Sequence, residues 1–373
     1  MKLKKDILIN ASILSEHNTG LGVYTYQLLE NVVPKLIKKG ITLDIMCKCE
    51  KFLPENCSEY AKVIGYNGVI SRTIKTNLNY NSNYKIVWST TQHGGIFSKT
   101  NQIITIHDLI PLMYPQGRMH QYLYYKFLLP IIIKKCKYIF TVSQNTKNDI
   151  ITYYNVSPDK ILVMYEAINY TNKKINRTDF KILEKKYSIN KNKYFLIIGI
   201  HFEYKNIHAV IEAYRTSEKM KEVKIVIIGK DSGKYGDKLK KIINENKLED
   251  KIIIMGYVGE NIKETLIENS IAIIFPSLYE GFGIPILEAF EKKAAMICSN
   301  TSSLPEVGGN AVLYFDPKNC NDIKKNMELI IEHPQIKEIL IERGVVQKEK
   351  FNWNDISENI VFKISDTLNW VDS

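Results

Sequence analysis

Two glutamates beside a glycine turn are the residues of this chain best suited to holding a ligand. Glu280 and Glu288 stand eight positions apart, and Gly281 and Gly283 follow the first of them. Carboxylates accept hydrogen bonds from hydroxyl groups, and glycine lets a ligand approach the main chain closely. The apolar run 271–275 just before them predicts a strand buried on both faces.

A helix is predicted directly after this turn. Pro285 has its backbone angle preset for a first helical turn, and residues 286–290 are mostly apolar. A strand, a glycine turn and a helix in this order leave N–H groups and the positive end of a helix dipole at the carboxyl end of a strand, where open α/β sheets bind anions. A purely structural turn with a capping glutamate would fit the same residues.

The whole string PSLYEGFGIPILEAF, residues 276–290, resembles the E-x7-E signature of the retaining glycosyltransferases of family 4. The resemblance implies an α/β protein of GT-B architecture, in which two Rossmann-like domains with parallel sheets face a central cleft. It also implies that Glu288 binds the ribose of a nucleotide diphosphate sugar and that Glu280 binds its sugar. The main chain of Gly281, Phe282 and Gly283 would cover sugar and phosphate.

A lysine in the loop after the first strand of the second half is the predicted phosphate ligand. Lys205 stands just before a helix, where an ammonium group can meet a phosphate, although most lysines are merely solvated. The loop 199–206 resembles the phosphate loop of family 4, which makes Lys205 the counterpart of its diphosphate-binding lysine. Ile200 and Tyr204 stand where other members carry arginine, so Lys230 is a candidate substitute.

The first half carries a second glycine segment. Gly20 and Gly22 follow a short β-like run, and Val23, Tyr26 and Leu29 then have the spacing of an apolar helix face. The segment is neither a dinucleotide fingerprint nor a Walker loop. It resembles the family 4 loop that closes over the donor diphosphate and borders the acceptor pocket.

A histidine at the end of a predicted strand is the candidate catalytic residue of the first half. His107 follows the buried-type strand 102–106, and a lone histidine there is either a packed structural residue or part of a site. The string TIHDLIPLMYP, residues 105–115, resembles family 4 enzymes in which this histidine lies beside the reacting sugar. We therefore predict that His107, Lys205 and Glu280 are catalytic.

Three further residues are predicted to contact a substrate or the histidine. Asp108 would orient the histidine ring or contact the acceptor, and Tyr24 would also contact the acceptor. Val258, which follows the predicted strand 251–255, is assigned to the nucleobase by resemblance. No Asp-x-Asp motif is present, so we expect lysine and helix N-termini to balance the diphosphate without a metal or another cofactor.

Composition narrows the class of protein. The chain has 373 residues, 45% of them hydrophobic and 24% charged, as expected for a globular protein of two domains. The six cysteines show no C-x-x-C pairing and are expected to be reduced thiols. No apolar run is long enough to cross a bilayer and no signal peptide is apparent, so we expect a cytoplasmic protein.

The net charge of +11 favours anionic partners. No nucleic-acid module is visible, so a nucleotide, an anionic membrane or a charged acceptor is expected. Residues 117–137 combine aromatic and aliphatic with basic side chains. They predict an amphipathic helix, either packed on the sheet with its basic face in water or lying on anionic lipid.

Two series of alternating strands and helices predict two domains. Residues 171–192 are polar and lysine-rich and mark the connection between them. We predict an acceptor-binding domain over 1–175, a nucleotide-sugar-binding domain over 176–353, and a terminal helix over 354–373 that packs back onto the first.

The expected function is retaining, metal-independent transfer of a hexosyl residue, with a mannose-like sugar favoured, from a nucleotide diphosphate sugar. The acceptor would be a saccharide hydroxyl, on a lipid-linked oligosaccharide in surface polysaccharide synthesis at the inner face of the cytoplasmic membrane. A sugar-nucleotide epimerase on the same fold is one alternative. A non-catalytic nucleotide- or carbohydrate-binding protein is another, suggested by the missing arginines at Ile200 and Tyr204.

Overall fold

The computed structural model describes the chain except for residues 1–3, 17, 19, 81–82, 170–178 and 373. The chain forms two compact units, one from residues 1–169 with 351–373 and the other from residues 170–350. The predicted domain boundary at 175/176 falls within 170–178, outside the described residues.

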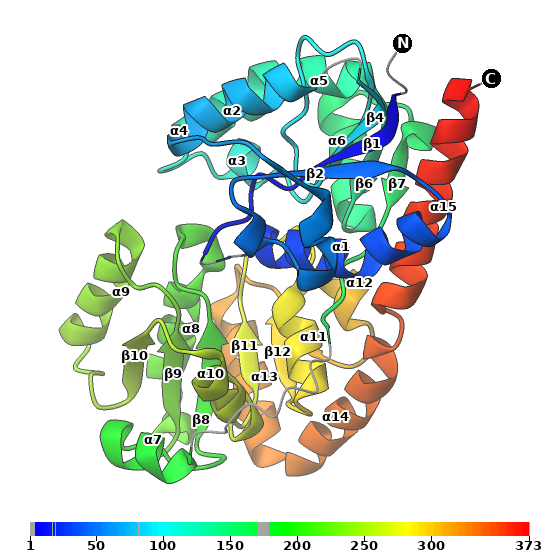
Figure 1. Cartoon of the computed structure of the whole chain (residues 1–373). Coiled ribbons are helices and arrows are strands. Elements are labelled where there is room, and N and C mark those ends of the chain that lie inside the picture. The colour runs from blue at the N-terminus through cyan, green and yellow to red at the C-terminus, as the bar shows by residue number, and fades with distance from the viewer. Residues whose placement is uncertain (1–3, 17, 19, 81–82, 170–178, 373) are drawn as a thin grey trace. The chain divides into compact units, whose positions relative to one another are not determined.

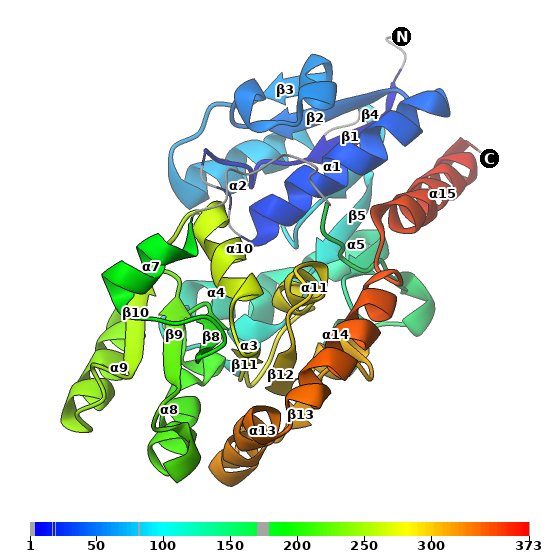
Figure 2. The same cartoon turned by 90° about the horizontal axis from the view of Figure 1, so that it is seen from below.

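The first unit is built on a seven-stranded parallel sheet with the order β3-β2-β1-β4-β5-β6-β7, whose strands are labelled in Figures 1 and 2 together. Its strands are β1 (Lys5–Asn10), β2 (Leu43–Cys47), β3 (Ala61–Val63), β4 (Tyr84–Ser89), β5 (Asn101–Ile106), β6 (Cys136–Thr141) and β7 (Ile161–Val163). The strand order reverses between β1 and β4, which makes their carboxyl ends the switch point of this sheet.

The helices of the first unit come from both ends of the chain. They are α1 (Gly20–Lys38), α2 (Gly68–Asn79), α3 (Ile110–Met113), α4 (Met119–Leu123), α5 (Leu129–Lys135), α6 (Gln144–Tyr154) and α15 (Trp353–Asp372). The terminal helix α15, red in Figure 1, packs against α1. Ser143 caps α6 as its sequence suggests, because its Oγ accepts a hydrogen bond from the Thr146 N–H at 3.0 Å.

The glycine segment of α1 differs from the prediction. The helix begins at Gly20, so Gly20 and Gly22 lie in its first turn and not in a preceding loop. Val23 is 43% exposed, so the predicted apolar face is wrong there. The buried face is centred one residue later because the Tyr24 ring packs edge-on against His107.

The predicted helix over 117–137 is present in three joined pieces. A π-helical turn, Tyr124–Leu128, separates α4 from α5. Pro130 lies in the first turn of α5, and the Tyr125 carbonyl, five residues before it, accepts a hydrogen bond from the Tyr154 hydroxyl at 2.7 Å. The π turn therefore lets the chain remain helical up to and through the proline.

The second unit contains a six-stranded parallel sheet with the order β10-β9-β8-β11-β12-β13, which can be followed in Figure 2. Its strands are β8 (Tyr194–Ile198), β9 (Lys224–Ile228), β10 (Ile252–Gly256), β11 (Ile273–Phe275), β12 (Met296–Ser299) and β13 (Leu313–Phe315). The order reverses between β8 and β11, and the loops after these two strands are the ones that carry Lys205 and Glu280.

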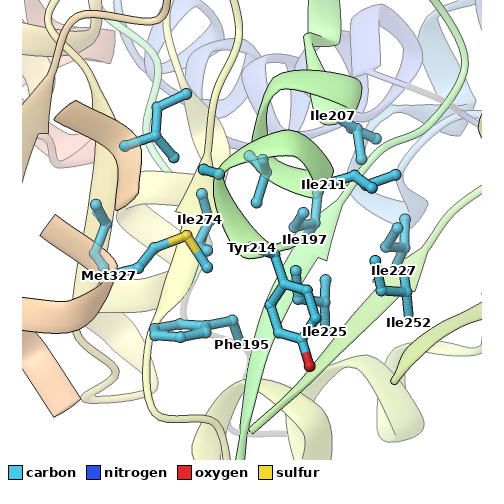
Figure 3. Packing of buried hydrophobic residues seen from close by; sticks show 14 of the residues in the cluster. Phe195, Ile197, Ile207, Ile211, Tyr214, Ile225, Ile227, Ile252, Ile274 and Met327 are labelled. Carbon is cyan, nitrogen blue, oxygen red and sulfur yellow. The ribbon is translucent and has the colours of Figure 1, made fainter. Parts of the chain in front are cut away.

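Helices of the second unit cover this sheet. They are α7 (Phe180–Tyr187), α8 (Ile207–Arg215), α9 (Lys234–Glu245), α10 (Glu260–Glu268), α11 (Ile284–Glu291), α12 (Leu304–Gly308), α13 (Cys320–Glu332) and α14 (Pro334–Lys348). Figure 3 shows Ile197 and Ile225 of the strands packed with Ile211 of α8 and Met327 of α13. Two parallel sheets with alternating helices confirm the predicted fold class of two Rossmann-like units.

Candidate active site

The loops after β8 and β11 are tied to each other. The Leu278 N–H donates to the Tyr204 carbonyl at 2.8 Å, which links the Lys205 loop directly to the Glu280 loop. A Cβ on Gly229 would lie 3.2 Å from the Gly199 Cα, so the β9 loop also approaches this point closely. The switch point of the second unit is thus a compact set of loop main chains, as ligand sites of open α/β sheets are.

Lys205 and Glu280 form an ion pair at this switch point. The Lys205 Nζ lies 2.6 Å from Glu280 Oε1, and the two side chains are 18% and 12% exposed. The same ammonium lies 5.4 Å from the centre of the Phe275 ring. The two residues that we assigned to the diphosphate and to the sugar are therefore neighbours, and the shielded pair retains more electrostatic strength than one in open water.

The glycine turn after Glu280 is held by two serines. The Ser302 Oγ accepts the Glu280 N–H at 3.0 Å. The Ser303 Oγ lies 2.6 Å from the Phe282 carbonyl oxygen and 3.0 Å from that of Glu280, and these two acceptors share its single hydrogen. Phe282 is only 4% exposed. The turn is therefore rigid before any ligand arrives, which favours binding since less ordering remains to be done.

Gly283 adopts a backbone conformation that disfavours side chains. Its φ is +123°, and a Cβ there would lie 3.0 Å from Leu304 Cδ2. We expect Gly283→Ala to lower the free energy of unfolding of the second unit by about 1–2 kcal/mol, measured by chemical denaturation. Gly259→Ala is the matched control, since its φ is −68° and the new methyl would meet only the Asn261 side chain. Equal stability of both variants would contradict the argument.

Glu288 lies in the second turn of α11 and also has a partner. The Nζ of Lys263, on α10, lies 2.8 Å from Glu288 Oε1 and 2.8 Å from Glu260 Oε1. Glu288 is 22% exposed at its side chain, and the residues on either side of it in α11 are buried. Glu288 therefore belongs to a partly shielded charge cluster that the sequence alone did not indicate.

The other predicted donor residues are less closely grouped. Ile200 and Tyr204, which stand where family members carry arginine, are 1% and 8% exposed and belong to the interior. Lys230 is exposed at the end of β9, and Val258 is half-buried just before α10. Lys205 is thus the basic residue that the structure places beside Glu280.

In the first unit, His107 is enclosed by acceptors. Its Nδ1 lies 3.0 Å from Glu166 Oε1 and its Nε2 lies 3.1 Å from the Thr90 carbonyl oxygen. Both bonds form together only when the ring carries a hydrogen on each nitrogen. The ring is 6% exposed, and the edge of Tyr24 packs 4.5 Å from it. His107 is therefore a fixed, buried donor in this structure.

Of the two residues predicted to contact the acceptor, Tyr24 is buried and Asp108 accepts a hydrogen bond from the main chain. Tyr24 is 5% exposed, and burial, followed by the charge of Glu166, raises the pKa of its phenol. Asp108 Oδ1 accepts the Ile110 N–H at 2.8 Å at the start of α3. The two ring nitrogens of His107 are contacted by Glu166 and the Thr90 carbonyl.

Sequence reasoning missed Glu166 and Lys263. Glu166 comes just after β7, a three-residue strand that the apolar pattern did not indicate, so its position at the carboxyl edge of the sheet was not foreseen. Lys263 lies among the charged residues of a helix, a pattern typical of a solvated face. In both cases the role of the residue depends on a contact with another part of the chain, which no local sequence pattern reveals.

Within the part of the chain that the structure describes, no group of three or more His, Cys, Asp or Glu side chains could hold a metal ion. Among the described helices, none has the length and hydropathy needed to span a bilayer.

Comparison with known proteins agrees with this geometry. Residues 20–171 match the model of Glycosyltransferase Family 4, and residues 179–346 match that of Glycosyl transferases group 1. The O-antigen chain mannosyltransferase RfbU of Salmonella typhimurium is 29% identical over 346 residues, which cover 86% of this chain and 91% of that protein.

Two further proteins are similar over much of the chain. The N-acetylgalactosamine-N,N'-diacetylbacillosaminyl-diphospho-undecaprenol 4-alpha-N-acetylgalactosaminyltransferase of Campylobacter jejuni is 24% identical over 258 residues, covering 68% of this chain and 67% of that protein. The structure of HepE of Anabaena in complex with UDP-glucose matches with a TM-score of 0.75 at 16% identity, over 97% of this chain and 99% of that one. Since each half of the chain matches one of the two models and its structural neighbours have the same GT-B fold, the chain belongs to the group 1 glycosyltransferases of family 4 and is a glycosyltransferase.

Proposed function

We propose that this enzyme transfers a mannosyl residue from a nucleotide diphosphate sugar to a hydroxyl group of a lipid-linked saccharide in surface polysaccharide synthesis. Transfer would retain the anomeric configuration and need no metal ion. The assignment of the donor-binding site rests on one observation, the ion pair of Lys205 and Glu280 at the switch point of the second sheet. The mannosyl residue is supported by the similarity to RfbU, an O-antigen chain mannosyltransferase.

The proposed reaction breaks the bond between the anomeric carbon and the diphosphate oxygen and forms one to the acceptor oxygen on the same face. Lys205 and the N-terminal end of α11 would stabilise the charge that develops on the leaving diphosphate. The acceptor proton would pass to the leaving phosphate oxygen. Glu280 would accept hydrogen bonds from the sugar hydroxyls, and Glu288 from the ribose hydroxyls.

Thermal unfolding with UDP-, GDP- and dTDP-sugars tests the donor. We expect one mannosyl nucleotide to raise Tm, in the presence and absence of EDTA, because a ligand that binds only the folded state stabilises it. Product analysis with a lipid-linked acceptor should then show retained configuration. Conversion of the donor without acceptor would favour the epimerase. Binding without turnover would favour a non-catalytic protein, the alternative suggested by the absence of arginine at Ile200 and Tyr204.

An exposed apolar and basic surface of the first unit supports a lipid-bound acceptor. Met119, Leu123, Phe127 and Ile131 are 58%, 47%, 57% and 44% exposed. These side chains are four residues apart, slightly more than one turn of a regular α-helix, so each would lie further around the helix than the one before it. The π turn at 124–128 has more residues per turn, which reduces this rotation and keeps the four side chains on one side. Such a helix, apolar on one side and rich in lysine, is suited to a membrane surface.

The loop before β5 extends this surface. Phe97 is 87% exposed, and its neighbour Ile96 receives a hydrogen bond from Lys135 of α5 and donates one to Asn77 of α2. Leu78, next to Asn77, is 73% exposed. Residues 68–137 contain nine Lys and Arg and a single acidic residue. We propose an anionic lipid bilayer as the partner, in keeping with the undecaprenyl-linked acceptor named for the Campylobacter relative.

Replacing Leu123, Phe127 and Ile131 together by serine should abolish most membrane binding. Each side chain loses the transfer energy of about 1.5–3 kcal/mol that burial in lipid would supply. Flotation with vesicles of equimolar phosphatidylglycerol and phosphatidylcholine measures the effect. The control replaces Ile339 and Val346 of α14, which are 43% and 69% exposed, by serine. Equal flotation of both variants and wild type would refute the assignment.

A further inference from the structure

The carboxylate of Glu288 is bound on one side by a lysine from another helix. Lys263 extends from the first turn of α10, and its Nζ contacts Oε1 of Glu288 and Oε1 of Glu260, each at 2.8 Å. The Lys263 side chain is only 18% exposed, while Glu260 is 60% exposed. Glu260 is therefore largely solvated, and Glu288 is the partner that depends on the lysine for its neutralisation.

The charge of Lys263 is maintained in this position. Burial lowers its pKa, but the charges and hydrogen bonds of Glu288 and Glu260 outweigh burial, so the pKa is raised above its usual value. The ammonium group thus remains a cation and a donor of three hydrogens. Two of these are directed to the carboxylates.

We propose that Lys263 is a positioning residue for donor binding: it holds Oε1 of Glu288 so that the other carboxylate oxygen accepts the ribose hydroxyls. The inference rests on the proposed function, in which Glu288 binds ribose. A glutamate on a helix has several rotamers, and fixing one before binding lowers the entropy that binding must remove.

A second ion pair between the same two helices offers a matched control. The Lys292 Nζ, at the end of α11, lies 2.7 Å from Oε1 of Glu264 on α10, and the side chains are 23% and 15% exposed. Lys292→Met removes an interhelical contact of similar length and burial without touching Glu288. Any general loosening of α10 against α11 should therefore appear in both variants.

The experiment compares nucleotides with and without ribose hydroxyls. Calorimetry measures the affinity of wild type, Lys263→Met, Lys263→Arg and Lys292→Met for the nucleoside diphosphate of the preferred donor and for its 2′,3′-dideoxy analogue. We expect Lys263→Met to weaken the hydroxyl-bearing nucleotide about tenfold, the effect of one charge-assisted hydrogen bond, and the dideoxy nucleotide hardly at all. Lys263→Arg should restore part of the preference, and Lys292→Met should resemble wild type.

Each outcome decides the question. Loss of the preference for ribose hydroxyls in Lys263→Met alone supports positioning through Glu288. Equal weakening of both nucleotides would show that Lys263 contacts the nucleotide elsewhere or merely holds the helices, and it would overturn the inference. Unchanged affinity would overturn it as well. If the wild type bound no nucleoside diphosphate, the proposed function would fail and the inference would fail with it. If only the inference fails, the wild type still binds the nucleotide, so the two failures can be told apart.

Discussion

Lys205→Ala is expected to reduce kcat/KM about hundredfold, since removing one preorganised group that stabilises developing charge typically costs this much. The ammonium is the cation that the structure places against Glu280, and the positions of Ile200 and Tyr204 supply no arginine to replace it. The loss should fall mainly on kcat, because the proposed leaving diphosphate carries more charge in the transition state than in the bound donor.

Substitutions of two other lysines serve as comparisons for Lys205→Ala. Lys230→Ala tests whether the exposed lysine after β9 shares the phosphate, and we expect a loss well below that of Lys205→Ala. Lys221→Ala should leave activity unchanged, because this side chain is 67% exposed and pairs only at the surface with Glu218. An activity of Lys205→Ala within about twofold of wild type would refute the assignment of Lys205 as the ligand of the diphosphate.

Removing Lys205 also changes its partner. Glu280 is 12% exposed at its side chain and would be left without the ammonium, which costs stability because a shielded charge loses its counter-ion. Lys205→Arg keeps the charge but presents it as a planar group, so it should recover part of the activity. Circular dichroism of each variant separates loss of folding from loss of catalysis.

The turn around Glu280 could be predicted because the residues that determine it are close together in the sequence. A buried strand, two glycines and Pro285 determine a turn and a helix start within fifteen residues, and the structure forms that turn with Gly283 at a φ of +123°. Most strands of both sheets could be located for the same reason, since their apolar runs are buried on both faces, whereas the short strand β7 could not.

Contacts between distant elements could not be predicted in this way. The partners of His107 are Glu166, which lies 59 positions along the chain, and a main-chain carbonyl that no side-chain pattern reveals. The same holds for Lys263, whose helix reads as a solvated charged surface. Likewise, Val23 and Tyr24 are both apolar enough to face inward, and the packing of Tyr24 on His107 decides between them.

Glu166→Ala is expected to reduce kcat/KM about hundredfold although the residue is only 8% exposed. The reason is that the resemblance to family 4 implies that the His107 ring lies beside the reacting sugar, where a displaced ring costs this much. Glu166 accepts from the Nδ1 of His107 at 3.0 Å and fixes the orientation of the ring. Glu166→Gln keeps an acceptor oxygen but removes the charge, so it should lose only about tenfold. Both variants should also have a lower Tm, since removing one partner of a buried pair leaves the other unsatisfied.

A double-mutant cycle separates positioning from general destabilisation. If Glu166 acts only through His107, then His107→Ala with Glu166→Ala should lose no more activity than His107→Ala alone, because one contact cannot be lost twice. Independent contributions would instead multiply and would show that Glu166 has a separate role. Full activity of Glu166→Ala would mean that the Thr90 carbonyl alone holds the ring, at 3.1 Å from its Nε2. The pair would then stabilise the first unit without contributing to catalysis.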